Sequence, residues 1–95
     1  MFGLYLGSAV LARHRAESAA DLAALAAAGA APQGADSACG QAERVAAGMN
    51  ARLDSCRLVG LVAEIQVSVT TELAVVGEAT AHGRARAGPV SATPP

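Results

Sequence analysis

The sequence predicts an α+β fold in which two helices pack on a three-stranded antiparallel sheet. Three features predict it: an alanine-rich segment without proline until Pro32, a short second segment with apolar residues at helical spacing, and two-residue alternation after Asn50. A chain of 95 residues has room for one small core. We expect a long helix over residues 1–31, a small α+β domain over 32–88 and a flexible tail over 89–95.

The first predicted helix has very little polar surface. Residues 1–12 carry no charge, and the following charged residues form a strip about 100° wide, made up of Arg13, His14, Glu17 and Asp21. Leu4, Leu11 and Leu25 are separated by seven and fourteen residues. Such a helix needs neighbours on more than one side, and Gly7 allows a close approach of another backbone. An ordinary alanine-rich core helix explains the pattern equally well.

The uncharged start of the chain is too short to cross a membrane as a helix. Twelve residues rise about 18 Å, whereas the hydrocarbon core is about 30 Å thick. The basic residues follow the apolar stretch instead of preceding it, which does not fit a secretory signal peptide. We expect either part of a longer apolar segment that begins upstream or a helix end that packs on protein.

The segment GAAPQG at residues 29–34 ends the first helix. Asp36 or Ser37 is expected to cap a second helix with a side-chain oxygen. This helix ends near residues 48–50, and one of its faces carries apolar residues three and four positions apart, namely Ala38, Ala42, Val45 and Met49.

The rest of the chain predicts three consecutive strands. Residues 53–59 form the first and continue through a tight connection at Gly60, and residues 63–73 alternate apolar and polar side chains. In the third strand, which extends from Val75 to Ala87, small residues alternate with polar ones. One face of this meander is therefore expected to pack on the helices while the other faces water.

Cys39 lies in the predicted second helix and Cys56 in the first predicted strand. If that helix packs on the sheet, the two cysteines face each other, and a disulfide would contribute about 3 kcal/mol and indicate an oxidising compartment. Two separate buried thiols are the alternative. Two cysteines are too few for a four-ligand zinc site, and their spacing is not that of a CxxC redox pair.

Composition and motifs argue against several functional classes. Hydrophobic residues make up 53% of the chain, charged residues 16%, and the net charge is −1, which excludes a disordered chain and a basic nucleic-acid binder. We find no nucleophile elbow, phosphate-binding loop or HExxH motif, and His14 and His82 have no evident partners. No catalytic residue, cofactor, metal ligand or small-molecule substrate is therefore expected.

The chain resembles the TadE-like pilus-assembly proteins of actinobacteria, also described as helicase/secretion-neighbourhood TadE-like proteins. The resemblance rests on LGSAVLARHRA at 6–16, AADLAALA at 19–26, the two cysteines, a valine-rich alternating strand and ARAGP at 85–89. It implies a pilin-like part, in which an N-terminal apolar helix lies in a membrane or filament and carries a small extracytoplasmic domain.

From this resemblance we expect a non-enzymatic minor pseudopilin or assembly component of a Tad/Flp-type pilus or related secretion apparatus. Its partners would be other pilin-like proteins, with a membrane as a further contact, and its location the cell envelope or the secreted fraction. The residues expected at the helix contacts are Leu4, Gly7, Leu11, Leu22 and Leu25. The alternative is a secreted soluble effector or protein-binding module, and an enzyme that uses a thiol would require free cysteines.

Overall fold

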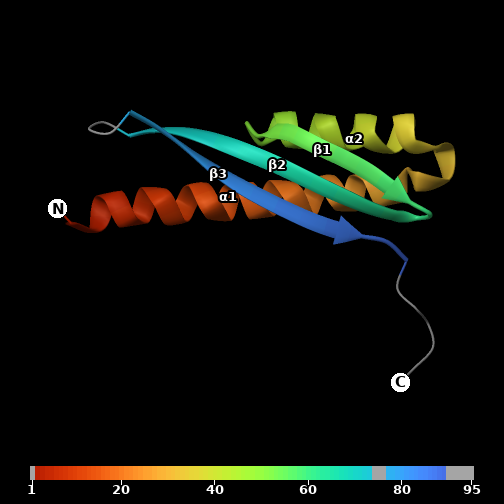
Figure 1. The fold of residues 1–95 in the computed structure, drawn as a ribbon, viewed down its shortest axis with the longest axis horizontal. Helices are drawn as coiled ribbons and strands as arrows, with labels where there is room; N and C mark the ends of the chain where they lie inside the picture. The colour runs from red at the N-terminus through yellow and green to blue at the C-terminus, as the bar shows by residue number, and fades with distance from the viewer. Residues whose placement is uncertain (1, 74–76, 90–95) are drawn as a thin grey trace, which may run out of the picture.

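The structure of the chain, a computed structural model, describes residues 2–73 and 77–89, and the side chains of residues 11–71 and 77–89. Its elements follow the order helix, helix, strand, strand, strand (Figure 1). Their bounds are α1 Phe2–Gly29, the 3-10 turn η1 Ala31–Gln33, α2 Ala35–Gly48, β1 Arg52–Val59, β2 Val62–Leu73 and β3 Gly77–Ala87. The predicted α+β arrangement is confirmed. Val75, predicted to begin the third strand, and residues 90–95 of the predicted tail lie outside the described residues.

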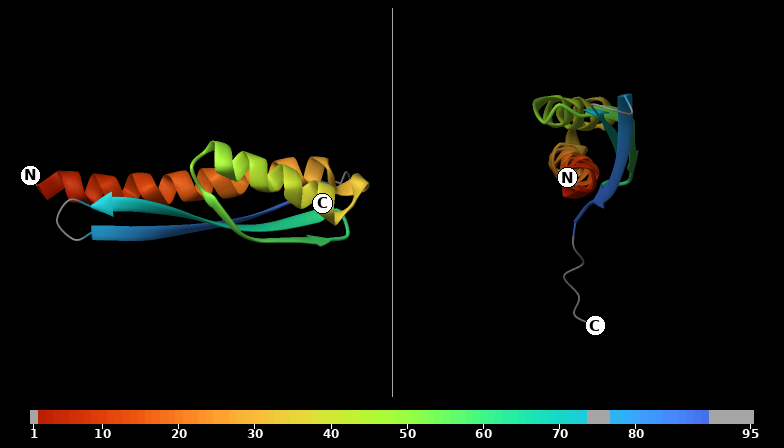
Figure 2. Two further views of the ribbon diagram at one scale, coloured as in Figure 1. Left: turned by 90° about the horizontal axis from the view of Figure 1, so that it is seen from above. Right: turned by 90° about the vertical axis from the view of Figure 1, so that its left-hand side faces the viewer.

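The domain has two layers, with both helices on one face of the sheet (Figure 2). The sheet is antiparallel with the order β1-β2-β3, so β2 is central. The long helix α1 lies along β2 and β3, while α2 packs beside α1 and over β1. No helix of the described residues lies on the opposite face of the sheet, which carries polar side chains.

The connection between the helices corrects one expectation. Neither Asp36 nor Ser37 caps α2, because the helix starts earlier and Gly34 occupies the N-cap position with φ 105°. Gly34 accepts the first helical hydrogen bond from the N–H of Ala38 at 3.0 Å. Residues with a Cβ rarely adopt such a φ, so glycine fixes the start of the helix. Asp36 lies in the first turn instead, where its charge complements the helix dipole.

The end of α2 lies where the sequence predicted it. Asn50 has φ 56° and donates its N–H to the carbonyl of Ala47 at 3.0 Å, and Ala51 donates to Ala46 at 2.8 Å. These two bonds satisfy carbonyls that the last turn leaves without partners. The chain then turns directly into β1.

A bulge adjusts the register of β1 against β2. Leu53 pairs with Val67 and Cys56 with Ile65, and the register shifts between Leu53 and Ser55. Without the extra residue, Leu53 and Cys56 would point to opposite faces, because side chains alternate along a strand. The bulge therefore brings Cys56 to the helix-facing side together with Leu53.

The core consists mostly of alanine. Ile65, Val67 and Val69 are the largest fully buried side chains among the described residues, and the others are methyl groups of α1, α2 and β2. The small side chains let the layers lie close together. At Gly83 in β3, an added Cβ would overlap the carbonyl of Ala16 in α1.

Candidate functional site

The helix α1 has two chemically different faces. Its buried face consists of alanines that are at most 9% exposed, namely Ala12, Ala16, Ala19, Ala20, Ala23, Ala24 and Ala27. On the other side, Leu11 is 68% exposed, Leu22 48% and Leu25 62%. At about 100° per residue, the three leucines fall within an arc of about 60°, opposite the centre of the alanine face. We call Leu11, Leu22 and Leu25, with the exposed Ser18 among them, the leucine face.

Close packing explains why the alanines lie inside and the leucines outside. The backbones of α1 and β3 nearly touch at Ala16 and Gly83, which leaves no room for a larger side chain between the layers. Single exposed leucines are common on protein surfaces, but large apolar side chains aligned along one helix are typical of an interaction site.

Of the five residues predicted for helix contacts, the structure places three on this surface. Leu4 and Gly7 belong to α1 but lie outside the residues whose side chains are described. His14 and Arg15 border the leucine face on its two sides at about 100° per residue. Farther round the helix, Arg13 and Glu17 form an exposed ion pair at 3.6 Å. The described part of α1 therefore presents an apolar strip with polar margins.

Cys39 and Cys56 form a disulfide that joins α2 to β1. The Cα atoms lie 5.8 Å apart, and the bond closes a loop between residues separated by 17 positions. Both cysteines are partly buried at the edge of the alanine core. Because both cysteines of the chain are bonded, a nucleophilic or metal-binding role would first require reduction.

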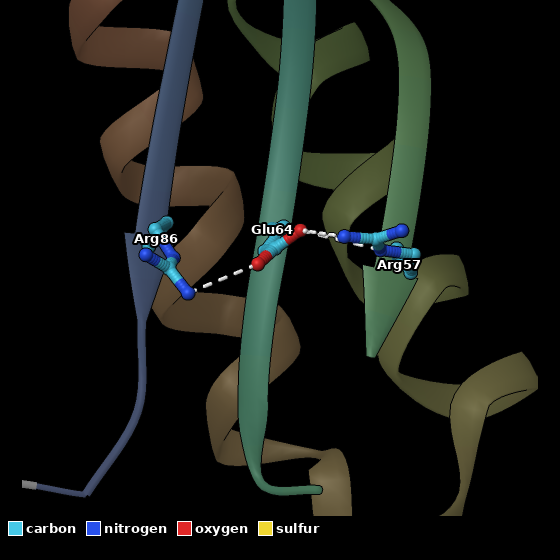
Figure 3. Close-up of polar contacts among 3 residues, drawn as sticks. All are labelled: Arg57, Glu64 and Arg86. Carbon is cyan, nitrogen blue, oxygen red and sulfur yellow. Dashed lines mark hydrogen bonds and ion pairs between the residues drawn. The ribbon is translucent and has the colours of Figure 1, made fainter. Parts of the chain in front are cut away.

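The open face of the sheet carries an ionic cluster of Arg57, Glu64 and Arg86, one residue from each strand (Figure 3). Arg57 donates two hydrogen bonds to Oε1 of Glu64, at 2.7 and 3.2 Å, and Arg86 lies 3.1 Å from Oε2. The hydrogen bond from Arg57 is the largest cause that lowers the pKa of Glu64 below its ordinary value. Burial opposes it, and the charges of both arginines lower the pKa further.

The sequence analysis placed the polar residues of the strand over 63–73, Glu64 among them, on the face toward water and did not predict this cluster. A signal was present, because a two-residue turn at Gly60 and Leu61 pairs residue 59 with 62 and hence Arg57 with Glu64. The position of Arg86 depends on the register of β3, which the sequence alone left open.

The cluster lines an open groove of about 410 Å³ on the polar face, together with Ser55, Gln66 and Arg84. Among the described side chains, no histidine joins this group, since His14 lies on α1 and His82 farther along β3. Over the same residues, no three potential metal ligands cluster together. The groove offers hydrogen bonds and positive charge, but it lacks a nucleophile paired with a base.

Among the residues that the structure describes, neither helix combines the length and the hydrophobicity needed to cross a bilayer.

Comparison with known proteins identifies a matching family and a relative. Residues 1–31 match the family described as putative Flp pilus-assembly TadE/G-like, which confirms the TadE-like resemblance there. A protein named apoptosis inhibitor Rv3654c, from Mycobacterium tuberculosis, is 50% identical over 52 residues. That match covers 55% of this chain and 62% of the relative, so the aligned part spans less than two thirds of the relative's length. No solved structure matches the chain.

Proposed function

We propose that the chain is a non-enzymatic subunit or assembly factor of a Flp-type pilus or a related secretion apparatus, acting at the cell envelope. The observation that carries the proposal is the leucine face of α1, which lies on the helix that matches the TadE/G-like family. The partners would be other pilin-like proteins of the apparatus, and the contact would run along α1 through Leu4, Gly7, Leu11, Leu22 and Leu25.

The physical argument begins with the apolar area that α1 leaves in water. Burial of a leucine side chain stabilises a contact by roughly 1.5–3 kcal/mol, so the leucine face can contribute several kcal/mol. Part of this is offset by the loss of motional freedom on association. Such a surface suits a subunit that is held by several neighbours in an assembly.

The disulfide supports a location outside the cytoplasm. Disulfides persist in oxidising compartments, and a small alanine-rich core gains much of its stability from such a bond. A pilus subunit acts in this kind of compartment.

The test replaces exposed leucines by glutamate in the bacterium that encodes the chain. Leu22→Glu and Leu25→Glu should reduce the surface-assembled pilus at least tenfold, measured by shearing and immunoblotting, while the amount of the chain stays constant. Leu61→Glu is the matched control, because Leu61 is 49% exposed but lies on the β1–β2 turn. Normal assembly with both helix variants, or equal defects in all three, would refute the proposal.

The name of the mycobacterial relative favours a second candidate, an effector or binding module that suppresses apoptosis in another organism's cells. This candidate requires the purified chain to reduce caspase activation when it is delivered into cultured mammalian cells. A chain with reduced and alkylated cysteines serves as a control that lacks the disulfide. Full caspase activation with the native chain would exclude this function and leave the assembly role.

A further inference from the structure

The strand β3 forms a free edge of the sheet along its whole length. It spans Gly77–Ala87, pairs only with β2 among the described strands, and has no proline. Backbone N–H and C=O groups on such an edge can pair with another strand unless side chains oppose it.

The two ends of β3 carry opposite charges. Glu78 lies near the start, and Arg84 and Arg86 lie near the end, all on the open face of the sheet. A second copy of β3 running antiparallel therefore brings its arginines to the acidic end of the first. The helix-facing positions of β3 are all glycine or alanine. These small residues can lie beside the same residues of a second copy without steric conflict.

The register that pairs the full length of both strands also brings opposite charges together. Antiparallel pairing over all eleven residues of the strand is centred on His82, so residue 77 of one copy faces residue 87 of the other. The same register places Glu78 opposite Arg86 twice, and Thr80 opposite Arg84. Opposite charges at directly paired positions stabilise an antiparallel sheet.

We propose that two copies of the chain pair through β3 in this register, forming a continuous six-stranded sheet about a twofold axis at His82. The interface is the same surface of both copies, as in most symmetric dimers. All helices lie on one face of the joined sheet, because the axis runs perpendicular to it. This inference does not depend on the pilus role, since it uses neither the leucine face nor α1.

Existing contacts favour this partner for Glu78 and Arg86. Within one copy, the register between β2 and β3 places Glu78 opposite Glu72, another acidic residue. No described cation forms an ion pair with Glu78. Arg86 uses one guanidinium nitrogen for Glu64 at 3.1 Å, and its remaining N–H groups are available. In the dimer, Arg86 bridges Glu64 of its own chain and Glu78 of the second copy.

The other edge of the sheet is less suited to pairing. The strand β1 has only eight residues, and the bulge after Leu53 interrupts its register. Bulges twist a strand locally and protect an edge from continuation. The register between β2 and β3 is regular throughout, so the free side of β3 presents an uninterrupted backbone.

The decisive experiment is cysteine cross-linking of the full chain. His82→Cys places two thiols at the twofold axis, so mild oxidation should give a dimer whose peptide map joins residue 82 to residue 82. Thr80→Cys is the matched control on the same strand and face. In the proposed register its two thiols lie four residues out of alignment, about 13 Å apart at the Cα atoms, beyond disulfide reach. Cross-linking at least ten times faster at position 82 supports the register, and equal or absent cross-linking overturns it.

Sedimentation equilibrium tests the dimer without added cysteines. Glu78→Arg should weaken the dimer about tenfold, because it replaces two attractive pairs by two repulsive ones. Glu43→Arg makes the same charge change on an exposed position of α2 and should leave the dissociation constant unchanged. A wild-type chain that is monomeric at 1 mM, or equal effects of both variants, would overturn the proposal without affecting the pilus role.

Discussion

Gly83 of β3 lies directly against the backbone of Ala16 in α1, so that the strand and the helix meet without a side chain between them. This contact sets the distance between the two layers of the domain. It also explains why the other positions on the sheet-facing side of α1, such as Ala12, Ala19 and Ala20, are alanine.

Gly83→Ala should destabilise the fold by about 1–3 kcal/mol, because its Cβ would overlap the carbonyl of Ala16 and force the layers apart. Urea unfolding measures the change. Gly40→Ala is the matched control in α2, where an added Cβ meets nothing within 4 Å. It should stabilise the helix by about 0.5–1 kcal/mol. Effects of the same sign at both glycines would contradict the close approach.

Removal of the disulfide should cost about 3 kcal/mol, since it closes a 17-position loop between α2 and β1. The double variant Cys39→Ala/Cys56→Ala should show this loss in urea unfolding. Reductant should lower the stability of the wild type by a similar amount and leave the double variant unaffected. Insensitivity of the wild type to reductant would mean that the bond does not support the fold.

The acid dependence of stability should follow Glu64. Its pKa is lowered in the folded chain, chiefly by the hydrogen bond from Arg57. The ionised form therefore stabilises the fold above the ordinary pKa of 4.5, and this contribution is lost as the pH falls through the lowered folded value.

Glu64→Gln should abolish this part of the dependence, measured as unfolding midpoints between pH 2 and 7. Titration of the Glu64 carboxyl by NMR gives an independent check. Arg57→Gln should raise the pKa of Glu64 more than Arg86→Gln does, because the contact with Arg57 is the larger cause. The reverse order would show that the cluster is arranged differently.

A change in side-chain size should affect stability much more on the buried face of α1 than on its exposed face. Leu25→Ala should change stability by less than about 0.5 kcal/mol, because the side chain is 62% exposed. Ala23→Leu should destabilise by about 1–3 kcal/mol, since Ala23 is fully buried against closely packed neighbours. Circular dichroism during thermal unfolding measures both. A larger loss for Leu25→Ala would place the leucine inside the core.

The sequence predicted the elements well, because each depends on a local pattern. The alternation from Ala63 to Leu73 defines a strand with one buried face, and Asn50 fits the end of α2. Contacts between distant segments were harder to predict. The bulge after Leu53 and the pairing of Glu64 with Arg86 depend on register, which is set by the packing of the whole sheet.

The separation of the two faces of α1 also separates two kinds of evolutionary constraint. Changes on the alanine side alter how the layers fit and affect folding directly. The outward side can vary in size and polarity while the domain beneath it keeps its shape. A lineage of such proteins can therefore acquire new binding specificities through substitutions at a few outward positions of α1, without rebuilding the core.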